Sequence, residues 1–142
     1  MSKIMQHAPA FILAAFLAFM AVQKFGAENV IFATIAERSG IALFEPLVRM
    51  ATGAAELVAA ALLVLPRTRL FGALGALAIV GGAIVFHLSP WLGVSVAMEP
   101  GSAPTPALFF MALGAFVGAA LVLIQQRATQ RRMPKADPKG TV

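Results

Sequence analysis

Long apolar runs, separated by short polar or proline-rich segments, dominate the chain. A membrane-spanning helix needs about 20 mostly apolar residues, with a range of about 17–25. Four segments meet this requirement: residues 8–25, 46–66, 70–86 and 106–124. The last two contain no polar side chain at all. The pattern therefore predicts an all-α fold, a bundle of four transmembrane helices.

Composition supports a membrane protein. Of the 142 residues, 60% are hydrophobic and 12% are charged, whereas a soluble domain carries about 25% charged residues. The high hydrophobicity also argues against a disordered chain. Cysteine is absent, which excludes disulfides, thiolate metal sites and iron–sulfur clusters.

The basic residues indicate how the bundle is oriented. Cytoplasmic loops of membrane proteins carry an excess of Lys and Arg. The loop at 89–105 has none, whereas basic side chains gather near the N-terminus, in the turn after residue 66 and in the tail: Lys3, Arg67, Arg69, Arg127, Arg131, Arg132, Lys135 and Lys139. We expect both termini to be cytoplasmic, in a bacterial-type inner membrane. Residues 1–125 would form the membrane domain. Residues 126–142 would form a disordered basic tail that contacts anionic lipid and not nucleic acid.

Three local features have two interpretations each. The first apolar run resembles a signal peptide, but a clean small-x-small cleavage site is missing, so we favour a retained helix. Residues 28–38 fit either a short amphipathic helix at the outer surface or a loop. Gly114 and Gly118 form a GxxxG step, for which we favour packing inside the bundle over a homodimer seam.

Polar side chains within the membrane segments define a candidate site. Glu56 lies about 15 Å into its segment at 1.5 Å per residue, where a charge costs at least ~2.5–3.5 kcal/mol. Arg49 and Thr52 share its helix face. Lys24 and His87 end the neighbouring segments on the predicted outer side. We predict a small polar pocket in the outer half of the bilayer, with Lys24, Arg49, Glu56 and His87 as its ligand-binding residues.

Each of these side chains also has a structural interpretation. Lys24 and Arg49 can extend to the lipid headgroups, and His87 can be an interfacial histidine with a satisfied hydrogen bond. Glu56 is too short and too deep for that. It is protonated, paired with Arg49 or Lys24, or part of a ligand or proton site.

Several short motifs, in a fixed order, match a known family. They are Gln23-Lys24-Phe25, Pro46-Leu47-Val48-Arg49, Gly53, Glu56-Leu57, Leu62-Leu63-Val64-Leu65, Arg67-Thr68-Arg69, Gly72-Ala73, Gly82-Ala83 and His87-Leu88. In these motifs, over about residues 8–125, the chain resembles the DoxX-like family of small four-helix integral membrane proteins. The family takes its name from a membrane subunit of a thiosulfate:quinone oxidoreductase. The resemblance implies the fold, a membrane location and a link to quinone-coupled redox chemistry, but no catalytic residues.

Three functions are compatible with these observations. In the first, the chain is a membrane subunit of a redox system that binds a quinone as its cofactor. It would not be an enzyme on its own, because it has no cysteine and its two histidines, His7 and His87, are expected at opposite membrane faces. Electrons would come from an oxidoreductase partner. In the second, the chain binds or transports a small anion, and in the third it is a structural anchor without a site.

Overall fold

Helices account for most of the fold. The computed structural model describes residues 3–132. Its four long helices are α1 (Lys3–Val22), α3 (Leu47–Val64), α4 (Arg69–Leu88) and α5 (Ala107–Arg132), and its short ones are η1 (Gln23–Phe25), α2 (Val30–Ser39) and η2 (Ala42–Phe44). Within residues 3–132, four helical segments are long and apolar enough to cross a membrane, by length and composition. The predicted all-α bundle is confirmed, and the chain fits an integral membrane protein.

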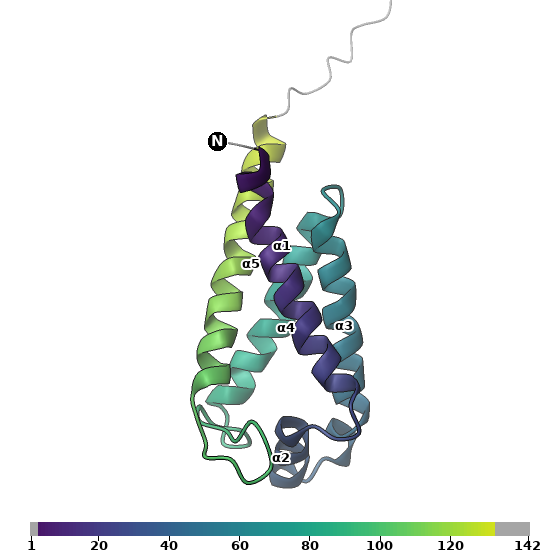
Figure 1. The fold of residues 1–142 in the computed structure, drawn as a ribbon, viewed down its shortest axis with the longest axis vertical. Helices are drawn as coiled ribbons and strands as arrows, with labels where there is room; N and C mark the ends of the chain where they lie inside the picture. Colours follow the sequence, from purple (N-terminus) through teal and green to yellow (C-terminus); the bar gives the residue numbers. More distant parts are fainter. Residues whose placement is uncertain (1–2, 133–142) are drawn as a thin grey trace, which may run out of the picture.

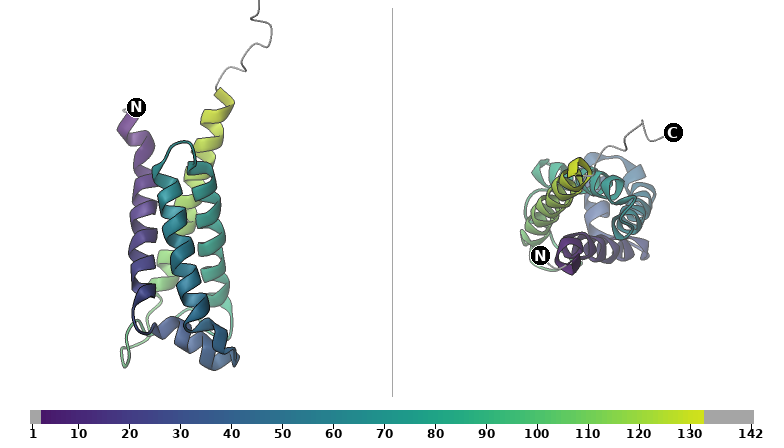
Figure 2. Two further views of the ribbon diagram at one scale, coloured as in Figure 1. Left: turned by 90° about the vertical axis from the view of Figure 1, so that its right-hand side faces the viewer. Right: turned by 90° about the horizontal axis from the view of Figure 1, so that it is seen from above.

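The two ends of the bundle differ (Figures 1 and 2). The start of α1, the α3–α4 turn and the last turns of α5 lie at one end, which we call the turn end. At the other, the α2 end, α2 and the loop at 89–106 lie across the bundle. Helix α1 packs against α3, α3 against α4, and α4 against α5, whereas α1 and α5 contact each other less. At the α2 end, the α1–α3 pair and the α4–α5 pair stand on opposite sides of the bundle (Figure 1). The side of the membrane on which each end lies stays a prediction.

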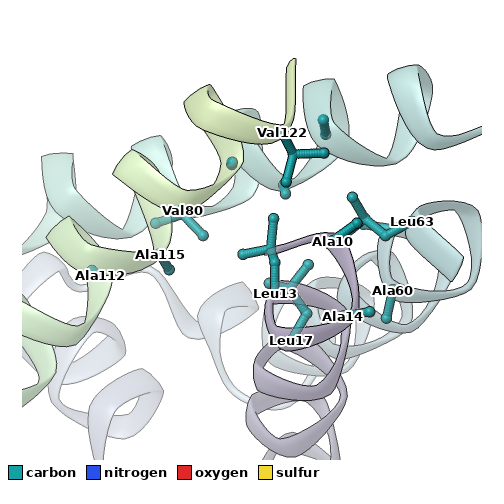
Figure 3. Packing of buried hydrophobic residues seen from close by; sticks show 14 residues of the cluster. Ala10, Leu13, Ala14, Leu17, Ala60, Leu63, Val80, Ala112, Ala115 and Val122 are labelled. Atoms are coloured by element: carbon teal, nitrogen blue, oxygen red, sulfur yellow. The ribbon is translucent and has the colours of Figure 1, made fainter. Parts of the chain in front are cut away.

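Small residues fill the core of the half of the bundle next to the turn end, which we call the turn half. Helices in lipid associate through close backbone approach at small side chains. The buried cluster, much of it visible in Figure 3, is rich in alanine and draws on all four long helices: Ala10, Leu13, Ala14, Leu17, Ala59, Ala60, Leu63, Ala73, Ala76, Val80, Ala112, Ala115, Ala119 and Val122. Among the glycines of the described chain, Gly72 makes the closest approach to another helix, α3. A Cβ at Gly72 would come within 2.7 Å of the Leu63 backbone nitrogen.

The turn between α3 and α4 satisfies the carbonyls at the end of α3. The last four carbonyls of a helix have no partner within it. Thr68 donates from Oγ1 to Leu62 O at 3.0 Å, and its backbone nitrogen donates to Leu65 O. Arg69 donates from Nε to Leu63 O at 2.8 Å and from Nη2 to Val64 O at 3.3 Å. The turn that the sequence marked only as basic is therefore a helix cap.

Residues 30–39 form a helix, which settles the choice between helix and loop. Asn29 caps its start, because Oδ1 accepts hydrogen bonds from Ile31 N at 3.1 Å and Phe32 N at 3.4 Å. Gly40 ends it with φ of 72°, a left-handed conformation that favours glycine. A second buried cluster joins α2 to the loop: Ile35, Leu92 and Val96. Helix α2 and this loop together cover the α2 end of the bundle.

Two features of α5 differ from the prediction. The helix continues to Arg132, past the predicted domain boundary at residue 125. The remainder of the predicted tail, 133–142, lies outside the described residues. In addition, a Cβ at Gly114 or Gly118 would meet nothing within 4 Å. The expected packing of these two glycines inside the bundle is therefore wrong, and the homodimer stays a prediction.

Candidate functional site

A cavity of about 700 Å³ lies between the four long helices in the half of the bundle next to the α2 end, the α2 half. The side chains of Leu17, Val80 and Ala112, which belong to the packed core, line its deep side. Ile31, Phe32 and Ile35 of α2 line the opposite side. Most of the lining is aliphatic or aromatic. Ligand pockets of about 300–1,000 Å³ typically combine such walls with a few placed polar groups.

Lys24 and Glu56 form a buried ion pair in the cavity wall. The Lys24 Nζ donates to Glu56 Oε1 at 3.0 Å and lies 2.9 Å from Oε2. It also donates to Met20 O at 3.2 Å. Lys24 is 7% exposed and Glu56 6%. Lys24 lies in η1, after the last turn of α1, so its side chain reaches back along α1 to meet the middle of α3. The lysine thus partners Glu56, one of the two pairings that the sequence left open.

His87 lines the cavity from α4. It lies in the last turn of α4 and is buried. Its Nδ1 is 2.9 Å from Gly93 O. Because a carbonyl only accepts, Nδ1 carries the hydrogen, which leaves Nε2 as an acceptor in the neutral ring. Phe109 of α5 packs edge-on against the ring at 5.8 Å between centroids. The histidine is held in one orientation by a loop carbonyl and an aromatic neighbour.

Further polar side chains in the lining are neutral. Thr52, one turn before Glu56, donates from Oγ1 to Val48 O at 2.8 Å, which leaves its oxygen lone pairs as acceptors. Gln23 and Asn29 also line the cavity. The polar part of the lining therefore consists of one ion pair whose charges cancel, one histidine and uncharged side chains.

Arg49 lies outside this group, although it is on the same helix. It is 2% exposed and does not line the cavity. Its Nε donates to Glu45 Oε1 at 2.7 Å. The other nitrogens donate to the backbone oxygens of Lys24, Gly26 and Ala27, at 2.9 Å for Gly26 and 3.4 Å for Ala27. Arg49 satisfies the carbonyls that follow α1, as Arg69 does for α3. The structure thus brings Lys24 and Glu56 together in the cavity wall with His87, and turns Arg49 away.

Sequence reasoning missed a second buried arginine and its partner. Arg69 is 1% exposed, at the turn end. Its Nη1 lies 2.7 Å from His7 Nδ1, and its guanidinium carbon lies 5.8 Å from the Phe11 ring centroid. A signal existed in the position of Arg69 at the first residue of α4, because side chains there can turn back to the preceding helix end. His7 and His87 lie at opposite ends of the bundle.

The arrangement suits an amphipathic molecule that is mostly apolar. Aliphatic and aromatic walls would bury its body. Lys24 and the His87 ring could exchange hydrogen bonds with its oxygen or nitrogen atoms. Because Glu56 neutralises Lys24, the cavity carries no excess charge in its wall when both are ionised.

Comparisons with known proteins identify no relative. The chain matches no protein-family model, no curated protein and no solved structure. The resemblance to the DoxX-like family therefore stays a prediction. The site rests on the geometry of this chain alone.

Proposed function

We propose that the chain is a DoxX-like membrane subunit of a quinone-linked redox system, and that the cavity binds the quinone head. The observation that carries this proposal is a mostly apolar cavity of about 700 Å³ with Lys24, Glu56 and His87 in its lining. In the proposal, the α2 end faces the outside of a bacterial-type inner membrane. An oxidoreductase partner supplies or removes the electrons.

The residues in the wall support proton-coupled chemistry. A quinone becomes a quinol by taking up two electrons and two protons, so groups that carry protons are needed beside its oxygens. Lys24 would donate a hydrogen bond to one quinone oxygen. In quinol oxidation, Nε2 of the neutral His87 ring would accept the proton of the other oxygen and the Glu56 carboxylate the second proton, while the partner takes the two electrons. In quinone reduction, the same two groups would first have to be protonated. These roles follow from donor and acceptor chemistry.

The two alternative functions have less support. An anion binder needs uncompensated positive charge, but Glu56 pairs with Lys24, and Arg49 spends its donors on Glu45 and backbone oxygens. A structural anchor needs no cavity. Close packing throughout would serve it better, because interiors are ordinarily filled.

The first experiment is mass spectrometry of the lipids and proteins that co-purify with the full chain in mild detergent. A stoichiometric quinone or oxidoreductase is the expected result. The second is titration of the purified protein with decylubiquinone. Glu56→Gln and His87→Ala should each weaken binding by about 10-fold or more, as expected for losing a hydrogen bond to a charged or buried group.

Controls are available in the same chain. Glu99→Gln changes an exposed loop carboxylate outside the lining, and His7→Ala changes the histidine at the turn end. Both should bind as the unmodified protein does. Equal binding by all variants, whatever the change in their thermal unfolding, would favour the anchor over the quinone site.

A further inference from the structure

The glycines of α4 show where this helix leaves α3. A Cβ at Gly72 would lie 2.7 Å from the backbone of Leu63 in α3, and a Cβ at Gly75 would lie 3.6 Å from Ala59 Cβ. At Gly82, further along the same side of α4, a Cβ would meet nothing within 4 Å. At neighbouring Gly81, a Cβ would lie 3.6 Å from the Phe116 ring of α5. Thus α4 separates from α3 toward the α2 end while it keeps its contact with α5.

The gap that results belongs to the cavity lining. Ala51 and Ala55 line the cavity from α3, and Ala78, Gly82 and Ala83 line it from α4. All four alanines are exposed. Residues 51 and 55, like 78 and 82, are one turn apart and share a helix face. Both edges of the gap are therefore made of residues with almost no side chain.

The opposite side of the cavity is bordered by larger groups. The lining residues of α1 include Phe16 and Met20, and those of α5 include Leu108 and Met111. Phe16, Met20 and Leu108 are at most partly exposed. The small residues of the lining are therefore concentrated on the α3–α4 side of the cavity.

In a bilayer spanned by the four long helices, the gap would lie at the depth of the hydrocarbon core. Gly82 is about 9 Å from the Leu88 end of α4, at 1.5 Å per residue. Large apolar side chains of α3 and α4 are exposed around it, among them Val58 at 59% and Val85 at 66%. These surfaces would face lipid, because helices of a spanning bundle turn apolar residues outward. Toward the aqueous side, Ile31, Phe32 and Ile35 of α2 cover the cavity.

We propose that the cavity opens sideways into the lipid between α3 and α4, at the level of Gly82, and takes its ligand from the membrane. The ligand class is a lipid-soluble molecule with a compact polar head and a long apolar tail. The head occupies the cavity beside Lys24 and Glu56, and the tail leaves through the gap. This inference uses the cavity of the proposed function, but not its redox role.

Tryptophan quenching tests the opening without any ligand. In a Trp91→Phe background, which removes the single native tryptophan, Gly82→Trp places a reporter at the gap. In phosphatidylcholine vesicles with brominated acyl chains, its fluorescence should fall nearly as far as that of Gly114→Trp. The latter is a matched control at an exposed glycine of α5 that also has nothing within 4 Å of its Cβ and does not line the cavity. Acrylamide in the water should quench both weakly.

The opposite quenching pattern would overturn the proposal. Strong acrylamide quenching of Gly82→Trp with weak bromine quenching would mean that the gap opens to water. Protection from both quenchers would mean that it is closed. Neither result would bear on quinone binding, so a failure here is distinguishable from a failure of the proposed function.

A binding experiment tests the route of the ligand. Gly82→Phe fills the gap, whereas Gly114→Phe adds the same side chain on α5. Association of decylubiquinone should slow by about 10-fold or more in Gly82→Phe and stay unchanged in Gly114→Phe, because the obstacle acts on the encounter. The tail-free head group, 2,3-dimethoxy-5-methyl-benzoquinone, should be affected less. Equal rates for Gly82→Phe and the unmodified protein would contradict the route. Failure of decylubiquinone to bind the unmodified protein would contradict the proposed function, and would leave the quenching result to decide on the opening.

Discussion

The turn half and the α2 half of the bundle are built from the same four helices, yet only the turn half is packed through. There, alanines and Gly72 bring the helices into contact, and the core is closed. In the α2 half, α3 and α4 separate and enclose a cavity. Uniform packing would be more stable, since voids forfeit dispersion contacts. The difference indicates that close packing in the turn half stabilises the bundle, and that this stability offsets the looser packing around the cavity in the α2 half.

Arg69 and Lys24, one buried basic residue from each half, differ in what they bind, whereas Arg49 of the α2 half binds carbonyls as Arg69 does. Arg69, in the turn half, uses its donors on the α3 carbonyls and on His7. Lys24, in the α2 half, pairs with Glu56 in the lining of the cavity. Arginine suits fixed, multiple hydrogen bonds, whereas the lysine ammonium is a compact charge on a flexible stem. A flexible donor in a cavity wall can change partner when a ligand arrives.

The largest effect is expected from breaking the ion pair. Glu56→Ala leaves the Lys24 ammonium buried without its carboxylate, so the free energy of unfolding should fall by about 3–5 kcal/mol. Lys24→Met combined with Glu56→Leu removes both charges and should restore most of that loss. Equilibrium unfolding in detergent measures both. If Glu56→Ala alone were as stable as the unmodified protein, the pair would have to be hydrated, and the α2 half would be open to water.

A smaller loss is expected from the buried arginine of the turn half. Arg69→Met removes the donors to Leu63 O and Val64 O and leaves His7 without its partner. Only the bond to Leu63 O is fully buried, and one buried polar group left unsatisfied costs about 1–3 kcal/mol, whereas Val64 O and His7 are partly exposed. Unfolding should be easier, while decylubiquinone binding by the folded protein is unchanged, because Arg69 does not line the cavity. Loss of binding at full stability would contradict the division of the bundle into two halves.

Gly72→Ala tests the closeness of the packing itself. The added Cβ would lie 2.7 Å from Leu63 N and 2.9 Å from Leu62 C. These are backbone atoms of α3, so the helices must move apart. Overpacking of this kind costs about 1–3 kcal/mol. The thermal midpoint in detergent should fall, and a rise would show that the two helices are not in contact at this point.

The sequence predicted the architecture well because one physical signal dominates it. Apolar runs of spanning length leave little alternative to helices, so α4 was predicted at 70–86 and lies at Arg69–Leu88. The short helix α2 was left undecided, although Asn29 and Gly40 are the residue types that begin and end helices. Its buried face has only a few apolar residues, which a loop can also carry.

The candidate site was predicted only in part, because its composition depends on how the helices are tilted relative to one another. Lys24, Glu56 and His87 line the cavity, whereas Arg49 does not. The sequence left both Arg49 and Lys24 open as partners for Glu56, because the choice depends on the course of η1 and the residues after it, which place the carbonyls that Arg49 binds. The cavity had no distinct signal, because alanine and glycine at a helix edge also mark close packing. Only the separation of α3 and α4 in the structure distinguishes a cavity edge from a closely packed helix contact.

The smallest predicted effect has the opposite sign to that of Gly72→Ala. Glycine within a helix is less favourable than alanine by about 0.8–1.0 kcal/mol. At Gly82 the new Cβ meets nothing within 4 Å, so Gly82→Ala should raise the free energy of unfolding by up to that amount. Gly114→Ala, at the exposed glycine of α5, should raise it equally. The comparison is sharp because Gly72 and Gly82 lie on one helix and receive the same substitution. Destabilisation at Gly82 would mean that α3 and α4 stay in contact along their length, and would remove both the cavity and its opening to lipid.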